Sequence, residues 1–185
     1  MGNPLLDRAS PAELADGRQV IETVEKIDRF PGLARILQEG LATLPAAKVP
    51  RHWRQMPVAI RLGFDWADAR RRFAALQGTV RARVAVVCQR CLEPFEMPLE
   101  LELKLRLTKA RTVAEAQQDF EDWELDGLTL RPVDLVEEAL IMALPLAALH
   151  DAPDCCTAPQ KNAQPENADM LRPFADLRAK LDDTN

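Results

Sequence analysis

The chain has 185 residues, 47% of them hydrophobic, and a formal net charge of −5, so it can bury one core but is short for two domains. No apolar run reaches the roughly 18 to 20 residues of a membrane-spanning helix, and the first residues lack the basic and apolar stretches of a signal peptide. We therefore expect a cytoplasmic protein with no membrane partner, whose four cysteines are reduced unless they bind a metal.

Hydrophobic spacing predicts helices and strands along the whole chain. Ser10 and Glu13 form the pattern of a capping box, which indicates a short helix that ends at Gly17. Periods of two or about 3.6 residues then predict the remaining elements. They are a weak strand over 18–27, a helix over 33–44, strands over 58–66, 77–87 and 95–107, a short strand around Trp123, and helices over 134–144 and 173–181.

The strand over 95–107 shows the clearest alternation. Leucines occupy one face from Leu99 to Leu107, and charged residues occupy the other, which predicts one buried and one solvated face. Because the strands follow one another closely, the sheet should be antiparallel. We predict an α+β fold with a curved antiparallel sheet or small barrel and flanking helices. Residues 1–55 would pack on a core over 56–149, and 150–185 would form a C-terminal loop and short helix, all in one domain.

Charge is distributed unevenly around Cys91. Residues 48–90 carry a net charge of +8, and residues 91–140 carry −8. The two blocks could neutralise each other across neighbouring strands. Alternatively, the basic block could bind phosphates, and the acidic block a basic partner. The candidate RNA-binding residues are Arg51, Trp53, Arg54, Arg70, Arg71, Arg72, Arg81, Arg83 and Arg90, and the candidate partner-binding residues are Glu121, Asp122 and Glu124.

Two short basic segments each allow two interpretations. Arg51-His52-Trp53-Arg54 alternates cations with an aromatic residue, which suits base stacking, but it also suits an exposed loop with Trp53 folded inward. The run Arg70-Arg71-Arg72 is either a phosphate-binding patch or a solvated turn.

The cysteines provide the strongest candidate for a metal site. Cys88 and Cys91 have C-x-x-C spacing on a predicted hairpin connection, which can direct two thiolates at one tetrahedral zinc ion. His150 and Cys155, in the loop after the last core helix, would complete the set. The alternative is that these thiols bind no metal. A redox role is less favoured, because the pair does not open a helix after a strand.

Signatures of catalysis are missing from the sequence. It contains neither a phosphate-binding glycine loop nor the G-x-S-x-G or H-E-x-x-H motifs of hydrolases and metalloproteases. We therefore expect a protein that is not an enzyme and has no small-molecule substrate.

Three segments, in order, resemble one protein family. They are 76–95, which includes Cys88-Gln89-Arg90-Cys91 and Pro94-Phe95; 133–145, which ends in Leu-Pro and is followed by His150; and Pro173-Phe174 with Leu177. From about Gly78 to the C-terminus the chain resembles the YceD family of large ribosomal RNA subunit accumulation proteins.

The resemblance implies a non-catalytic role in 23S rRNA synthesis, processing or accumulation. The partners would be rRNA or pre-ribosomal particles, bound directly or through a protein. Some relatives carry extra cysteines in the C-terminal loop, similar to a zinc knuckle, whereas this sequence has His150 and the Cys155-Cys156 pair there. The alternative function, from a different class, is an adaptor that holds a basic partner such as an unassembled ribosomal protein.

Overall fold

The computed structural model describes residues 3–109, 120–125 and 127–150. The predicted C-terminal helix over 173–181 and Cys155 lie outside them. In the described part the helices are α1 (Pro11–Asp16), α2 (Pro31–Leu41) and α3 (Pro132–Met142), and the strands are β1 (Val20–Lys26), β2 (Pro57–Trp66), β3 (Ala74–Val87), β4 (Pro94–Lys109) and β5 (Glu121–Leu125). No helix in these residues is both long and apolar enough to span a bilayer.

The five strands form one open sheet in the order β1-β2-β3-β4-β5, so the α+β prediction is confirmed. Strands β1 to β4 are antiparallel neighbours, as predicted. The connections from β2 to β3 and from β3 to β4 are short, whereas residues 27–56, which include α2, separate β1 from β2. β5 differs, because it runs parallel to β4, with Leu105 opposite Glu121. Sequence proximity predicts an antiparallel pair only across a short turn, and residues 110–120 separate these two strands. The sheet is therefore mixed, and it is not a closed barrel.

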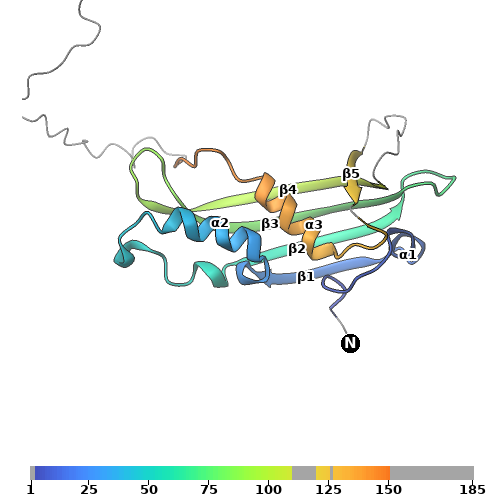
Figure 1. Cartoon of the computed structure of the whole chain (residues 1–185), viewed down its shortest axis with the longest axis horizontal. Coiled ribbons are helices and arrows are strands. Elements are labelled where there is room, and N and C mark those ends of the chain that lie inside the picture. Colours follow the sequence, from blue (N-terminus) through green and yellow to red (C-terminus); the bar gives the residue numbers. More distant parts are fainter. Residues whose placement is uncertain (1–2, 110–119, 126, 151–185) are drawn as a thin grey trace, which may run out of the picture.

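Helices cover one face of the sheet. α2 and α3 lie across that face, and α1 packs at the end of β2 and β3 (Figure 1). The leucines of β4 point to this side and pair with small or apolar residues of β3, including Leu103 opposite Gly78. A side chain at position 78 has no room, because its Cβ would lie 2.1 Å from the carbonyl oxygen of Arg61. Gly78 thus allows β2 and β3 to approach closely beneath the helices.

A glutamate of α3 caps the N-terminus of α2. α2 has Phe30 at its N-cap position, and no side chain of its own caps it. Instead, Glu137 of α3 accepts hydrogen bonds from the backbone N–H groups of Gly32, at 2.5 Å, and Leu33, at 3.1 Å. A carboxylate here satisfies free amide groups and interacts favourably with the helix dipole, so Glu137 fixes α2 relative to α3.

Candidate functional site

A cluster of two cysteines and a histidine lies at one end of β3. Cys88 directly follows β3, Cys91 lies in the turn before β4, and His150 comes from the segment after α3. Their ligand atoms all lie within 4.8 Å of one another, and Cys91 Sγ is 3.6 Å from His150 Nδ1. Cys88 is buried, and the other two side chains are half-buried. The cluster is therefore compact and reachable from solvent on one side.

Backbone N–H groups of the hairpin donate hydrogen bonds to the sulfur of Cys88. Leu92 closes the turn by donating its N–H to the carbonyl of Cys88 at 2.9 Å, and it adopts a left-handed φ of 58°. Burial raises the pKa of the Cys88 thiol. Hydrogen bonds from the backbone N–H groups of Cys91, Arg90 and His150, and from the Cys91 side chain, lower that pKa to about 5. The thiolate that metals require is thus the favoured form of Cys88 at neutral pH.

His150 is held at the hairpin by its neighbours in the chain. Gln89 donates its backbone N–H to the carbonyl of Ala148 at 2.9 Å, and the Phe95 and His150 rings lie with their centroids 4.3 Å apart. The structure places His150 beside the cysteine pair, and its binding of a metal stays a prediction. Cys155, the fourth predicted ligand, lies outside the described residues.

The separation of one sulfur and one nitrogen in the cluster can be compared with that in a tetrahedral zinc site. With Zn–S near 2.3 Å and Zn–N near 2.0 Å, the sulfur and nitrogen of two tetrahedral ligands lie about 3.5 Å apart. The observed separation of Cys91 Sγ and His150 Nδ1 is 3.6 Å. A direct thiol–imidazole hydrogen bond has a similar length, so this distance fits both a metal site and a metal-free pair. Residues Cys88, Cys91 and His150 could hold three of the four positions, and a fourth ligand would still be needed.

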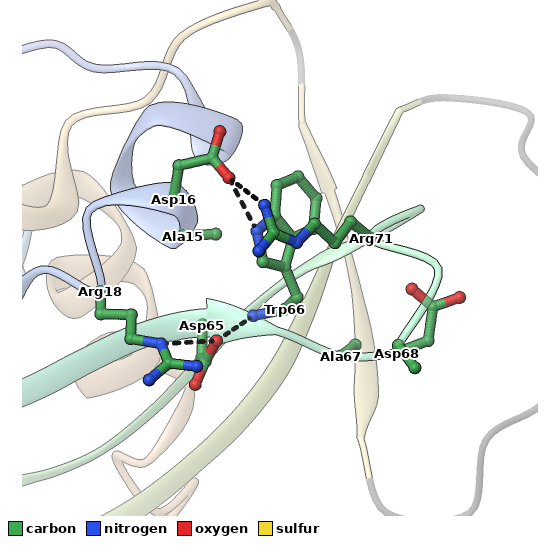
Figure 2. A pocket seen from close by; sticks show the side chains of 9 residues that line it. Ala15, Asp16, Arg18, Asp65, Trp66, Ala67, Asp68 and Arg71 are labelled. Carbon is green, nitrogen blue, oxygen red and sulfur yellow. Dashed lines mark hydrogen bonds and ion pairs between the residues drawn. The ribbon is translucent and has the colours of Figure 1, made fainter.

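The arginine run lies at the opposite end of β3, in the turn that connects it to β2. Figure 2 shows Asp16 accepting hydrogen bonds from Trp66 Nε1, at 3.1 Å, and from Arg71, at 3.3 Å. Arg72 pairs with Asp68 at 2.6 Å, whereas Arg70 forms no ion pair with a described residue. The Asp16–Arg71 pair is largely exposed, so it is weak and can be exchanged for another anion.

Two hollows adjoin at this turn. One, of about 360 Å³, is lined by polar groups that include Arg18, Asp65 and Arg71 (Figure 2). The other, of about 500 Å³, is lined partly by Phe73 and Leu128, and Trp66 and Arg71 belong to both. Arg18 and Arg71 have φ values of 44° and 54°, a region that side-chain-bearing residues rarely adopt and that concentrates at functional sites. The turn thus combines arginines with two aromatic rings.

The other predicted RNA-binding residues lie elsewhere. Arg81 and Arg83 of β3 face Glu100 and Glu96 of β4 at 3.9 and 4.0 Å, as in the interpretation in which the charge blocks neutralise each other across strands. Trp53 is only 8% exposed, as in the alternative in which its ring folds inward, and its buried ring is not open for stacking. Arg54 lies over that ring and pairs with Asp28 at 3.1 Å.

Two more of the predicted RNA-binding arginines, Arg51 and Arg90, lie outside the strands. Both are exposed and form no ion pair with any described residue. The structure therefore distributes the basic block over the segment before β2, the strands β2 and β3, the turn between them and the cysteine hairpin, rather than gathering it into one surface.

Of the three predicted partner-binding acids, Asp122 already forms an ion pair within the fold. Asp122 of β5 makes a two-pronged contact with Arg106, at 2.5 and 2.8 Å, and Arg106 is itself 2% exposed. This hydrogen bond lowers the pKa of Asp122, and burial only partly opposes it. Glu121 and Glu124 are exposed and form no ion pair with a described residue. Asp122 thus anchors β5, and its two acidic neighbours face solvent.

Sequence analysis missed Asp16, Arg18, Trp66 and Phe73 at the arginine turn. Trp66 and Phe73 flank the arginine run in the sequence, which was the available signal for the two rings. Asp16 and Arg18 carried no such signal, because they reach the turn only when α1 packs against the ends of β2 and β3.

Comparison with known proteins gives one consistent result. A family model described as "Large ribosomal RNA subunit accumulation protein YceD" matches residues 76–179. A Haemophilus influenzae protein with that same description is 30% identical over 114 residues, which cover 57% of this chain and 64% of the relative. The chain therefore matches less than two thirds of that relative's length. No solved structure shows significant similarity.

Proposed function

The chain belongs to the YceD family of large ribosomal RNA subunit accumulation proteins, and from this premise we propose that it supports 23S rRNA accumulation in the cytoplasm by non-catalytic binding. The observation that carries the proposal is the family match over 76–179, which includes β3, the cysteine hairpin and α3. A binding role also agrees with the lack of enzyme signatures in the sequence. The partner would be rRNA or a pre-ribosomal particle.

We place the RNA contact at the arginine turn, Arg70-Arg71-Arg72. Proteins that bind single-stranded nucleic acid combine cations for the phosphates with aromatic faces for the bases. Arg70 has no ion pair among the described residues, and the half-buried rings of Trp66 and Phe73 lie beside the run. Arg81 and Arg83 are poorer candidates, because acidic side chains face them across the strands.

The turn can be tested against a matched set of arginines on the sheet. Replacing Arg70, Arg71 and Arg72 with Gln removes three positive charges, and so does replacing Arg61, Arg81 and Arg83. For binding to large-subunit rRNA, the first variant should lose at least about tenfold in affinity. The slope of log K against log salt should fall by about 2, at roughly 0.7 per lost phosphate contact with a single strand. The second variant should change much less. Equal losses in both would remove the turn as the contact.

The cellular role has its own measurement, the ratio of large- to small-subunit rRNA after depletion of the protein. A selective fall in the large-subunit rRNA is expected, with rescue by the wild-type protein and by the Arg61, Arg81 and Arg83 variant. An unchanged ratio would contradict the proposed function. If purified complexes instead retain a basic protein after nuclease treatment, the adaptor function, acting through the exposed Glu121 and Glu124, replaces direct RNA binding.

We also propose that Cys88, Cys91 and His150 bind a structural zinc ion, with Cys155 as the fourth ligand. The support is the compact donor set, the lowered pKa of Cys88 and the sulfur–nitrogen separation. Such an ion would tie the chain after α3 to the hairpin. Purified protein should contain about one zinc per chain, and Cys88→Ser should lose it. His52→Ala, which changes the chain's other histidine, should retain it. Zinc well below one per chain under reducing conditions would contradict the site.

A further inference from the structure

An apolar groove lies beside the cysteine hairpin. Its volume is about 350 Å³, and its lining includes Ile36 and Leu37 of α2, Leu92 of the hairpin, and Leu144 and Leu146 after α3. Leu92 is 63% exposed, and Leu146 is fully exposed. Leucines exposed side by side around a groove, unlike single apolar residues scattered on a surface, indicate that something covers them.

The chain itself continues from the edge of this groove. Ala148 lines the groove, and its carbonyl accepts the hydrogen bond from Gln89 that holds this segment to the hairpin. The described residues end two positions later, at His150, and residues 151–185 follow. A random-coil chain of 22 residues, the number from 151 to 172, has a root-mean-square span of about 25 Å, so a segment tethered at that length stays near the groove at a high effective concentration.

Residues 173–181 have the pattern of an element that needs an apolar surface. Phe174, Leu177 and Leu181 fall at spacings of three and four residues, on one side of a helix, and Asp176 falls on the opposite side. The family match also extends to residue 179, so most of this segment is matched by the same model as β4, β5 and α3.

We propose that residues 173–181 of the same chain occupy the groove between α2, the cysteine hairpin and the segment after α3, covering Leu92 and Leu146. Phe174 and Leu177 enter the groove, and Asp176 faces solvent. The occupant is intramolecular because the chain leaves the described fold at the groove itself. The docking goes beyond the proposed function and does not depend on it, since it requires neither RNA nor metal.

Hydrogen exchange of the full-length protein, read by mass spectrometry, tests the docking. In the wild type, residues 173–181 should exchange at least about tenfold more slowly than an unstructured chain. The variant Phe174→Asp with Leu177→Asp should abolish this protection and speed exchange at 36–41 and 86–92. Asp176→Asn, on the opposite side of the segment, should leave both unchanged.

A second pair of variants changes the groove rather than residues 173–181. Leu92→Asp with Leu146→Asp should release residues 173–181, whereas Leu128→Asp, at a leucine that is 73% exposed at the other end of β3, should not. The variant Phe174→Asp with Leu177→Asp changes no residue of the described fold. It therefore tests the docking even if Leu92→Asp with Leu146→Asp unfolds the protein. Unprotected residues 173–181 in the wild type would overturn the proposal. Protection that rises with protein concentration would also overturn it, since it would identify a second copy as the occupant.

Discussion

The two faces of the sheet are built from the same strands but are held in different ways. On the covered face, the β4 leucines pack against β3 beneath α2 and α3, and Gly78 allows the close approach of β2. On the other face, charged side chains alternate across the strands, with exposed pairs such as Arg81–Glu100. Burial and close packing support the first face, whereas only weak, screened attractions operate on most of the second.

This difference explains why a large basic block does not by itself identify a binding surface. Within β3, Arg81 lies directly opposite Glu100 of β4, and Arg83 reaches diagonally to Glu96, because the antiparallel register brings the two charged stretches together. The arginines in the turn before β3 have no strand partner. Of the turn arginines, Arg70 forms no ion pair with a described residue, and Arg71 and Arg72 pair only with the side chains of Asp16 and Asp68.

The largest expected effect is on the covered face, at Gly78. Gly78→Ala should lower the free energy of unfolding by about 3 kcal/mol, because the new Cβ would lie 2.1 Å from a backbone oxygen and 2.9 Å from Leu62 Cα. Gly40→Ala in α2 is the matched control. Its Cβ would meet nothing within 4 Å, and it should stabilise by about 0.5 to 1 kcal/mol. Denaturant unfolding measures both, and equal effects would refute the close approach of β2 and β3.

A smaller effect is expected in the helical layer over that face. Glu137→Ala removes the acceptor of two amide groups at the start of α2 and should cost about 1 to 2 kcal/mol of unfolding free energy. The neighbouring Glu138 is exposed and makes no hydrogen bond or ion pair with a described residue, so Glu138→Ala should be near neutral. If chemical unfolding gives the two variants the same midpoint, Glu137 does not cap α2.

The Arg106–Asp122 pair is the exception on the open face, because Arg106 is buried there. The hydrogen bond from Arg106 lowers the pKa of Asp122 in the folded protein. The stabilisation from this ion pair is therefore fully present above the pKa of Asp122 in the unfolded chain, near 4. It is lost as the pH falls through the lower pKa of Asp122 in the folded protein. Asp122→Asn should lower the Tm at pH 7, and the difference from wild type should shrink below about pH 4. Glu121→Gln, one residue away, should show no such trend.

The smallest effect is expected for the exposed pairs. Arg81→Ala removes a contact of 3.9 Å between two largely exposed side chains and should change the free energy of unfolding by less than about 0.5 kcal/mol. The change should diminish further at high salt. A loss above about 1.5 kcal/mol would mean that the open face contributes to stability as the covered face does, and the contrast between the two faces would fail.

Local patterns by themselves determined most of the elements. Alternating leucines from Leu99 to Leu107 and the Ser10–Glu13 capping box specify their structures through neighbours in the chain, so β4 and α1 could be predicted. The strand patterns on either side likewise placed Cys88 and Cys91 in a hairpin turn. Each of these depends on interactions over a few residues, which the sequence shows directly.

Only the tertiary structure decided which side chains meet across long separations. The parallel pairing of β5, the capping of α2 by Glu137 and the contact of Asp16 with Trp66 and Arg71 join residues from distant segments. His150 was chosen from the sequence by residue type, and the fold brought it within 3.6 Å of Cys91. Such contacts depend on strand register and helix packing, which the buried surface of the whole domain sets together, and no local pattern records them.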